Sequence, residues 1–128
     1  MADEDEALHI VHPDELVSAD PTKGMDRRRA FEAPGLWAGL VDTTPETVSG
    51  WHHHGEHESS LYIVAGTVLL EFGPGGKSVV EARPGDFVHV PAGVVHRESN
   101  PGDVVSRAVI ARAGEGAPTV NVDGPDPA

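Results

Sequence analysis

Four of the eight histidines of this 128-residue chain fall within the six positions from His52 to His57. Two carboxylates, Glu56 and Glu58, lie among them or directly after them. Imidazole nitrogens and carboxylate oxygens together suit divalent first-row transition metals. The cluster therefore predicts a metal site.

The spacing of the cluster suggests which of its side chains act together. In an extended segment, successive side chains point to opposite faces, so His52 and His54 share a face and Glu58 returns to it, while His53 faces away. A His-rich surface loop or a remnant of a purification tag is the alternative. A tag normally lies at a terminus, however, and the strand-like apolar run 61–64 follows this cluster. We therefore expect His52, His54 and Glu58 to point toward one metal ion.

A second stretch strengthens this prediction. Gly85, Pro91, Gly93, His96 and Asn100 have the spacing Gly-x5-Pro-x-Gly-x2-His-x3-Asn. This pattern resembles the second motif of the cupin superfamily at every defined position. The cluster before it is similar to the first cupin motif, whose core is His-x-His, three or four residues, Glu, six residues, Gly. The resemblance extends over roughly residues 37 to 110.

The resemblance implies a fold and a ligand set. In cupins the two motifs form facing strand pairs of a small β-barrel, and together they bind one divalent transition metal. Carried over to this chain, the ligands are His52, His54, Glu58 and His96. The resemblance does not distinguish Fe, Mn, Ni, Co and Zn as the native metal.

One departure from the family pattern leaves the third ligand open. Seven residues separate Glu58 from Gly66, where the pattern has six. A β-bulge near residues 59 and 60 could absorb the extra residue and keep Glu58 aimed inward. Counted back from Gly66 instead, the carboxylate position falls on Ser59, a poor metal ligand. The other alternative is His57 in place of the carboxylate.

The rest of the chain predicts an all-β fold with short arms at both termini. Fifteen Gly and eleven Pro without a long helical pattern favour many short strands joined by turns. We expect a flexible acidic arm over residues 1–7, a jelly-roll-like barrel of two antiparallel sheets over 8–111, and a Gly- and Pro-rich tail over 112–128 with at most one edge strand. Candidate strands are 8–11, 27–32, 37–43, 47–52, 61–65, 67–72, 77–82, 87–91, 94–98 and 104–111.

Composition excludes several classes of protein. The chain has no cysteine, so disulfides and thiolate chemistry are excluded. A formal net charge of −12 argues against nucleic acid, since phosphate binding needs clustered Lys and Arg. The one basic run, 27–29, could bind an anionic group, but the preferred interpretation is a strand end with solvated charges. Without an apolar run near the ~18 residues of a membrane span and without a signal segment, we expect no membrane partner and a cytoplasmic protein. The acidity is also consistent with a salt-rich habitat.

Two classes of function follow from the resemblance. The first is a metal-dependent enzyme acting on a small organic molecule, such as an Fe- or Mn-type dioxygenase, or an isomerase or epimerase. The second is a non-catalytic module that binds or senses a sugar or another metabolite. Tyr62 and Trp51 are the candidate residues of the substrate pocket, and the resemblance implies a homodimer.

Overall fold

The computed structural model describes residues 7–126, and almost all of its regular structure is β-strand. Most of the predicted acidic arm, residues 1–6, therefore lies outside the described residues. The elements are η2 (Pro13–Glu15), β1 (Val17–Ser18), β2 (Met25–Ala33), β3 (Leu36–Thr43), β4 (Thr47–Val48), β5 (His52–His53), β6 (Glu58–Ala65), β7 (Val68–Phe72), η3 (Pro74–Gly76), β8 (Ser78–Ala82), β9 (Phe87–Val90), β10 (His96–Asn100), β11 (Ser106–Ala113) and β12 (Val120–Asn121).

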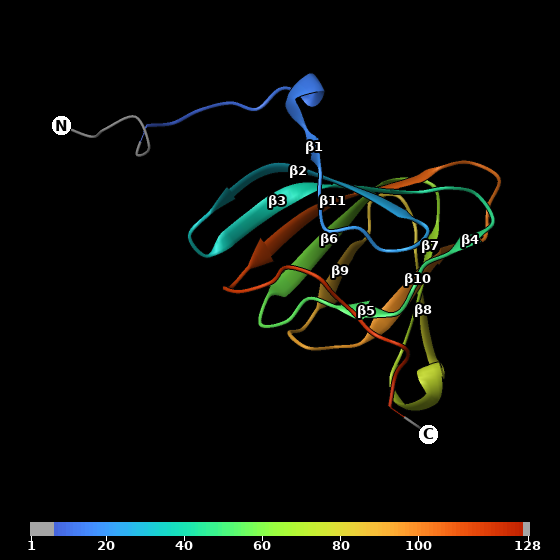
Figure 1. Ribbon diagram of the computed structural model, residues 1–128. Coiled ribbons are helices and arrows are strands. Elements are labelled where there is room, and N and C mark those ends of the chain that lie inside the picture. Colours follow the sequence, from blue (N-terminus) through green and yellow to red (C-terminus); the bar gives the residue numbers. More distant parts are fainter. Residues whose placement is uncertain (1–6, 127–128) are drawn as a thin grey trace.

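The strands form two sheets that face each other (Figure 1). The first sheet has the order β1-β2-β3-β11-β6-β9, and the second has the order β12-β5-β10-β7-β8, with β4 also paired to β10. All of these pairings are antiparallel. The predicted all-β fold of two antiparallel sheets is confirmed.

The core lies between the two sheets because the long strands alternate apolar inward and polar outward residues. In β11 every second residue from Ser106 to Arg112 is buried and those between are exposed. Each fully buried aliphatic or aromatic side chain contributes roughly 1.5–3 kcal/mol to folding. The buried apolar residues are Trp37, Val41, Leu61, Ile63, Val68, Leu70, Ala82, Val90, Ala108 and Ile110.

Strand β6 sets the orientation of the residues that follow the histidine cluster. From Glu58 to Ile63 its side chains alternate strictly between exposed and buried. The register with β11 shifts only near its end, where Ile63 and Ala65 pair with consecutive residues and Val64 is left over. Gly66 then turns the chain with a φ of +71°, and a Cβ on it would lie 2.7 Å from the Cα of Ser106. The bulge therefore lies at Val64, not near residues 59 and 60.

Two further expectations differ from the structure. Residues 8–11 form no strand, and Leu8 and Ile10 are largely exposed. Strand β11 continues to Ala113, two residues past the predicted end of the barrel, so Arg112 belongs to the sheet. Within residues 7–126, no helix has the length and apolar character needed to cross a membrane.

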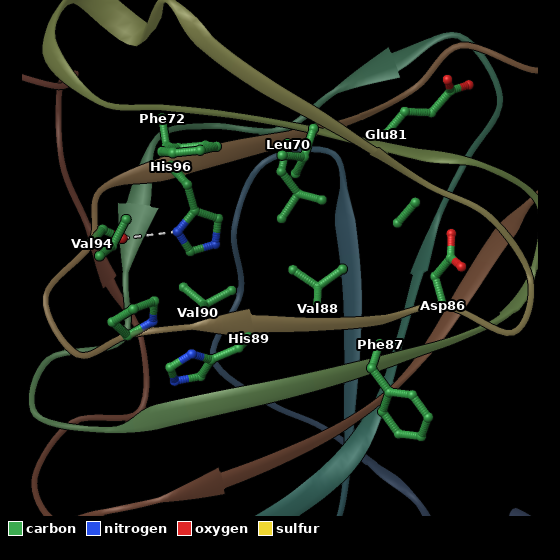
Figure 2. Close-up of a pocket in the computed structure, with 13 residues that line it drawn as sticks. Leu70, Phe72, Glu81, Asp86, Phe87, Val88, His89, Val90, Val94 and His96 are labelled. Atoms are coloured by element: carbon green, nitrogen blue, oxygen red, sulfur yellow. Dashed lines mark hydrogen bonds between the residues drawn. The ribbon is translucent and has the colours of Figure 1, made fainter.

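A pocket of about 500 Å³ is lined by the edge strands of both sheets, β9 of the first and β8 of the second (Figure 2). Its walls are mostly apolar, with His96 at one end and the carboxylates of Glu81 and Asp86 at the other. The full lining is Leu70, Phe72, Val80, Glu81, Ala82, Asp86, Phe87, Val88, His89, Val90, Pro91, Val94 and His96. Such dimensions are within the usual range of small-molecule sites.

Candidate metal centre

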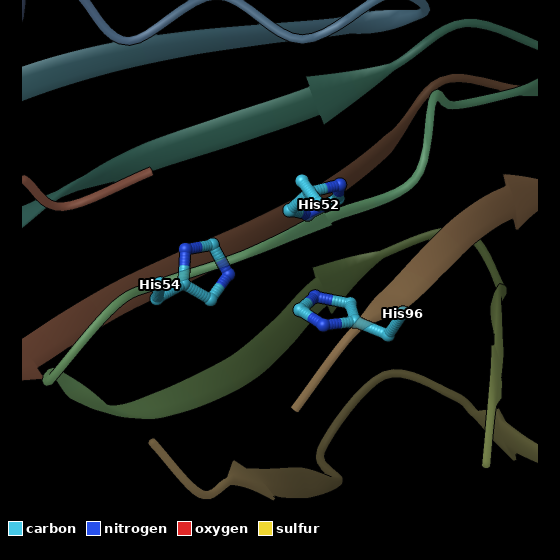
Figure 3. A group of neighbouring side chains, drawn as sticks. All are labelled: His52, His54 and His96. Atoms are coloured by element: carbon cyan, nitrogen blue, oxygen red, sulfur yellow. The ribbon is translucent and has the colours of Figure 1, made fainter. Parts of the chain in front are cut away.

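Three histidine side chains converge between the sheets (Figure 3). His52 lies on β5, His54 follows that strand by one residue, and His96 begins β10, directly opposite His52 in the strand register. One ring nitrogen from each lies within 4.8 Å of the other two. All three side chains are buried. The structure thus brings together three of the four predicted ligands.

Backbone carbonyls hold the three rings in one tautomer. Each Nδ1 lies 2.9 Å from a carbonyl oxygen: His52 from Gly50, His54 from Pro118 and His96 from Val94. A carbonyl oxygen only accepts hydrogen bonds, so each Nδ1 must carry the proton and each Nε2 keeps a free lone pair. The Nε2 atoms of His52 and His96 are buried without a hydrogen-bond partner. This arrangement is typical of metal-binding histidines, whose other nitrogen is fixed by a carbonyl or carboxylate.

Burial keeps His52 and His54 uncharged. It lowers the pKa of His52 to about 2, with the neighbouring His96 as the next cause. Burial is also the main reason why the pKa of His54 is far below its usual range, and the positive charge of Arg112 is the second. A metal binds neutral imidazole, so His52 and His54 need not lose a proton when a metal binds near neutral pH.

The donor set fits a divalent transition metal. Three imidazole nitrogens with unshared lone pairs, in a buried space, are a ligand set used for catalytic zinc and suited to copper, iron and nickel. Three protein ligands would leave coordination positions free for water or a substrate. The residues present therefore could hold one metal ion that remains open to ligands.

The structure does not bring Glu58 to this group, and the predicted orientation of this residue is wrong. The carboxylate is exposed on the outer face of β6, where it accepts a hydrogen bond from the backbone N–H of Ala92 at 2.6 Å and lies 3.3 Å from Nε2 of His89. The inward position is taken by Ser59, which is 3% exposed. Because the bulge comes after residue 63, nothing reverses the alternation at Glu58.

The alternative ligand and the two predicted pocket residues also lie apart from the three histidines. His57 is buried, but it is not in the metal-ligand group, and its Nδ1 lies 3.1 Å from the carbonyl oxygen of His54. Tyr62 faces outward and packs its ring 4.7 Å from that of Phe87. Trp51 lies under the guanidinium of Arg97, 4.6 Å from it, and does not line the pocket described above.

Replacing Glu58 by Ala should therefore change metal affinity by less than the 10- to 100-fold that is typical for loss of a residue supporting a ligand. His57→Ala should have a larger effect than Glu58→Ala, because His57 contacts the backbone of His54. Competition against a chelator of known affinity measures both. A severe loss of metal in Glu58→Ala alone would show that the carboxylate rotates into the site.

Sequence reasoning missed a group of buried charges beside the histidines. Arg27, Glu98 and Arg112 are each no more than 4% exposed, and all three line a small cavity of about 10 Å³ together with His54 and Ser59. The interpretation of residues 27–29 as a solvated strand end is therefore wrong for Arg27. The signal available was strand alternation, which places residue 27 inward and residue 28 outward against Asp42.

Fold and site together define a small two-sheet β-barrel with a three-histidine centre that could hold a metal. The chain belongs to the cupin family, because the model of the cupin domain matches residues 39–111. A comparison with curated protein sequences gave no match.

Solved structures share the fold at low sequence identity. An uncharacterized conserved protein with a double-stranded beta-helix domain from Klebsiella pneumoniae is 20% identical with a TM-score of 0.72, covering 96% of this chain and 98% of that one. The polyketide cyclase RemF from Streptomyces resistomycificus is 21% identical with a TM-score of 0.73, covering 91% and 86%. Oxalate decarboxylase from Bacillus subtilis is 18% identical with a TM-score of 0.71, covering 84% of this chain but 30% of that one.

Proposed function

We propose that this cupin binds one divalent transition metal through His52, His54 and His96 and transforms a small organic molecule held in the adjoining pocket. One observation carries the proposal: His96 belongs both to the histidine group and to the lining of the 500 Å³ pocket. A molecule in the pocket would therefore have one end beside the metal.

The walls of the pocket indicate what kind of molecule fits. Leu70, Val88 and Val90 offer apolar surface along its length, which favours a mainly hydrocarbon or aromatic body. Burying that body would also exclude water from the histidine end. Glu81 and Asp86 at the far end suit a polar or cationic group that points toward solvent.

The three-histidine donor set favours one class of reaction over oxygenation. A divalent metal supplies Lewis acidity to a bound oxygen atom, and three uncharged ligands would leave its positive charge little reduced. This favours isomerisation or cyclisation of a carbonyl compound, and it accords with the likeness in fold to a polyketide cyclase. Iron oxygenases commonly use two histidines and a carboxylate, and Glu58 is not placed to serve.

Dioxygenase chemistry is the second candidate, and one observation favours it. With only three histidines in the group, a six-coordinate metal would have positions for both dioxygen and an organic substrate. The two candidates differ in their products, because oxygenation adds mass and isomerisation does not.

The experiment that tests the proposal combines metal analysis with turnover. Untagged protein purified without chelators or nickel resin should contain a transition metal at near one per chain. Loaded protein is then incubated in air with small aromatic and aliphatic carbonyl compounds, and the products are weighed by mass spectrometry. If the protein takes up no metal even when metal is added, the proposal is overturned. If a compound binds but no product forms, the protein is a sensing module and not an enzyme.

Two matched variants connect turnover to the pocket. Val88 is half-buried and lines the pocket, whereas Val79 is exposed on β8 and does not. Val88→Phe should fill the pocket and abolish turnover with metal content unchanged, and Val79→Phe should change neither. Equal turnover by both variants would show that the substrate binds elsewhere.

A homodimer is proposed on separate grounds. Val109, Tyr62 and Phe87 are cross-strand neighbours on the outer face of the first sheet, and all three are exposed. A contiguous apolar patch of this kind is typical of a contact between proteins. Light scattering on the wild type and on a Phe87→Glu variant measures whether a dimer forms through this face.

A further inference from the structure

Arg112 is a buried cation without a hydrogen-bonded counter-group. Its side chain is 2% exposed, its guanidinium lies 4.6 Å from the ring of Trp37, and its Nε and Nη1 atoms are buried without a hydrogen-bond partner. Burial lowers its pKa to about 9, which still leaves it charged at neutral pH. Buried charges in proteins are normally paired, so this one points to a missing anion.

Its neighbours supply no anion within hydrogen-bonding distance of Arg112 among the described residues. Arg27 is also buried, and its Nη1 already donates to the carbonyl oxygen of Asp20 at 2.5 Å and to the hydroxyl of Thr22 at 2.6 Å. Glu98 is the one carboxylate lining the same small cavity, and its Oε2 has no hydrogen-bond partner. Across residues 7–126, no ion pair joins Glu98 to either arginine.

The charges around this cavity become positive overall once a metal is bound. Without a metal, the carboxylates of Glu98 and Asp20 both interact favourably with the two guanidinium groups. A divalent cation held by three neutral histidines would add two more positive charges in a space of low dielectric constant, where unpaired charge is costly. An anionic ligand would relieve this excess.

A small cavity lies between Arg112 and His54. Ser59 is the cross-strand neighbour of Arg112, it points inward, and its hydroxyl has no hydrogen-bond partner. The cavity that both residues share with His54 has a volume of about 10 Å³, close to that needed for one water molecule. Met25 forms another part of its wall, and a methionine side chain adapts easily to a larger occupant.

We propose that the space between Arg112, Ser59 and the metal position beside His54 binds a carboxylate group that comes from a ligand and not from the chain. This inference rests on the proposed function for the metal and deepens it, because it assigns the substrate class: a small monocarboxylate, or the carboxylate end of a larger molecule. Arg112 pairs with one oxygen and the Ser59 hydroxyl donates to the same group, while the other oxygen faces the metal.

The test uses formate, the smallest carboxylate, with formamide as its uncharged analogue. Protein loaded with Co²⁺ is titrated while its visible spectrum is recorded, since this spectrum reports on ligands entering the coordination sphere. Formate should shift the spectrum and formamide should not. Arg112→Met, which keeps an apolar stem of similar length, should weaken formate binding by about tenfold or more, the effect of losing a hydrogen bond to a charged group.

Arg107→Met is the matched control. Arg107 lies on the same strand but on its outer face, where it pairs with Asp42. It should bind formate as the wild type does. Co²⁺ affinity should be unchanged or higher in Arg112→Met, because a neighbouring positive charge is removed. Equal formate binding by the wild type and Arg112→Met, or none by the loaded wild type, would overturn the proposal.

A second arm, on metal-free protein, separates a failure of the carboxylate proposal from a failure of the metal proposal. If Co²⁺ does not bind at all, thermal unfolding is measured in formate for the wild type and for Arg112→Met. Stabilisation of the wild type alone still supports a carboxylate site at Arg112, and equal behaviour of the two proteins refutes it.

A third arm distinguishes the two sources of the carboxylate. Phenylacetate is added in competition with formate to Co²⁺-loaded protein. Competition supports a site for the acidic end of a larger, partly apolar molecule, whereas binding of formate alone supports the site as one for a free small anion.

Discussion

Replacing His54 or His96 by Ala should lower the affinity for a divalent metal by more than about a hundredfold. Loss of a residue that merely supports a ligand costs 10- to 100-fold, and each of these residues would supply one of the three ligand atoms of the proposed site. Neither a carboxylate nor a fourth histidine of the described chain is in the group to take over. Elemental analysis of untagged protein, followed by competition against a chelator, measures the loss.

The matched control is His53→Ala, one residue from both His52 and His54. His53 points to the other side of β5, is only half-buried, and its Nδ1 accepts a hydrogen bond from the N–H of Gly55 at 3.0 Å. Its removal should leave metal content close to that of the wild type. If His53→Ala lost the metal while His54→Ala kept it, the assignment of faces along β5 would be wrong.

Metal-free protein should lose stability steeply as pH falls below about 6.5. In the folded chain burial lowers the pKa of His52 to about 2 and that of His54 further still, whereas in the unfolded chain both have ordinary values near 6.5. Between these limits the unfolded state binds more protons, so the free energy of unfolding is highest above pH 6.5 and decreases with falling pH. Each such histidine contributes about 1.4 kcal/mol per pH unit.

Urea unfolding of metal-free protein at several pH values between 7 and 5 checks this dependence. His52→Leu removes one of the two titrating groups and should reduce the slope, while His89→Gln, at an exposed position, should leave it unchanged. A stability that does not vary over this pH range would mean that the two rings are accessible to protons in the folded state. Saturating metal should also raise stability, since metal binds only the folded site.

The second motif was the most informative part of the sequence. Its glycines and proline mark turns whose conformation few other residues adopt, and Gly93 indeed has a φ of +75°. Those turns precede β10, and the resemblance to the second cupin motif placed His96 among the ligands. The short spacing between His52 and His54 was equally informative, because too few residues separate them for the alternation to fail.

Glu58 could not be placed in the same way, because its orientation depends on where the extra residue of β6 is accommodated. Moving the bulge from residue 59 to Val64 reverses the face of Glu58 and of Ser59. Only the pairing with β11 decides between these positions. Pairing between strands distant in sequence leaves no local pattern in a single chain.

The buried arginines were missed for a different reason. A charge run is usually solvated, and Arg112 lay just outside the predicted barrel. Its burial requires the aromatic ring of Trp37 on the neighbouring strand, which is visible only once β3 and β11 are paired. Single residues that break the inward apolar pattern of a strand are the positions that merit closest inspection in such sequences.

Part of the C-terminal tail contributes to the histidine centre. The carbonyl oxygen of Pro118 orients His54, and Val120 and Asn121 of β12 pair with His53 and His52 of β5. Docking of this tail and occupancy of the site by a metal are therefore thermodynamically linked, and each must strengthen the other by the same factor. A protease cut or a fusion that detaches residues 118–121 should therefore weaken metal retention, and a bound metal should protect these residues from detachment.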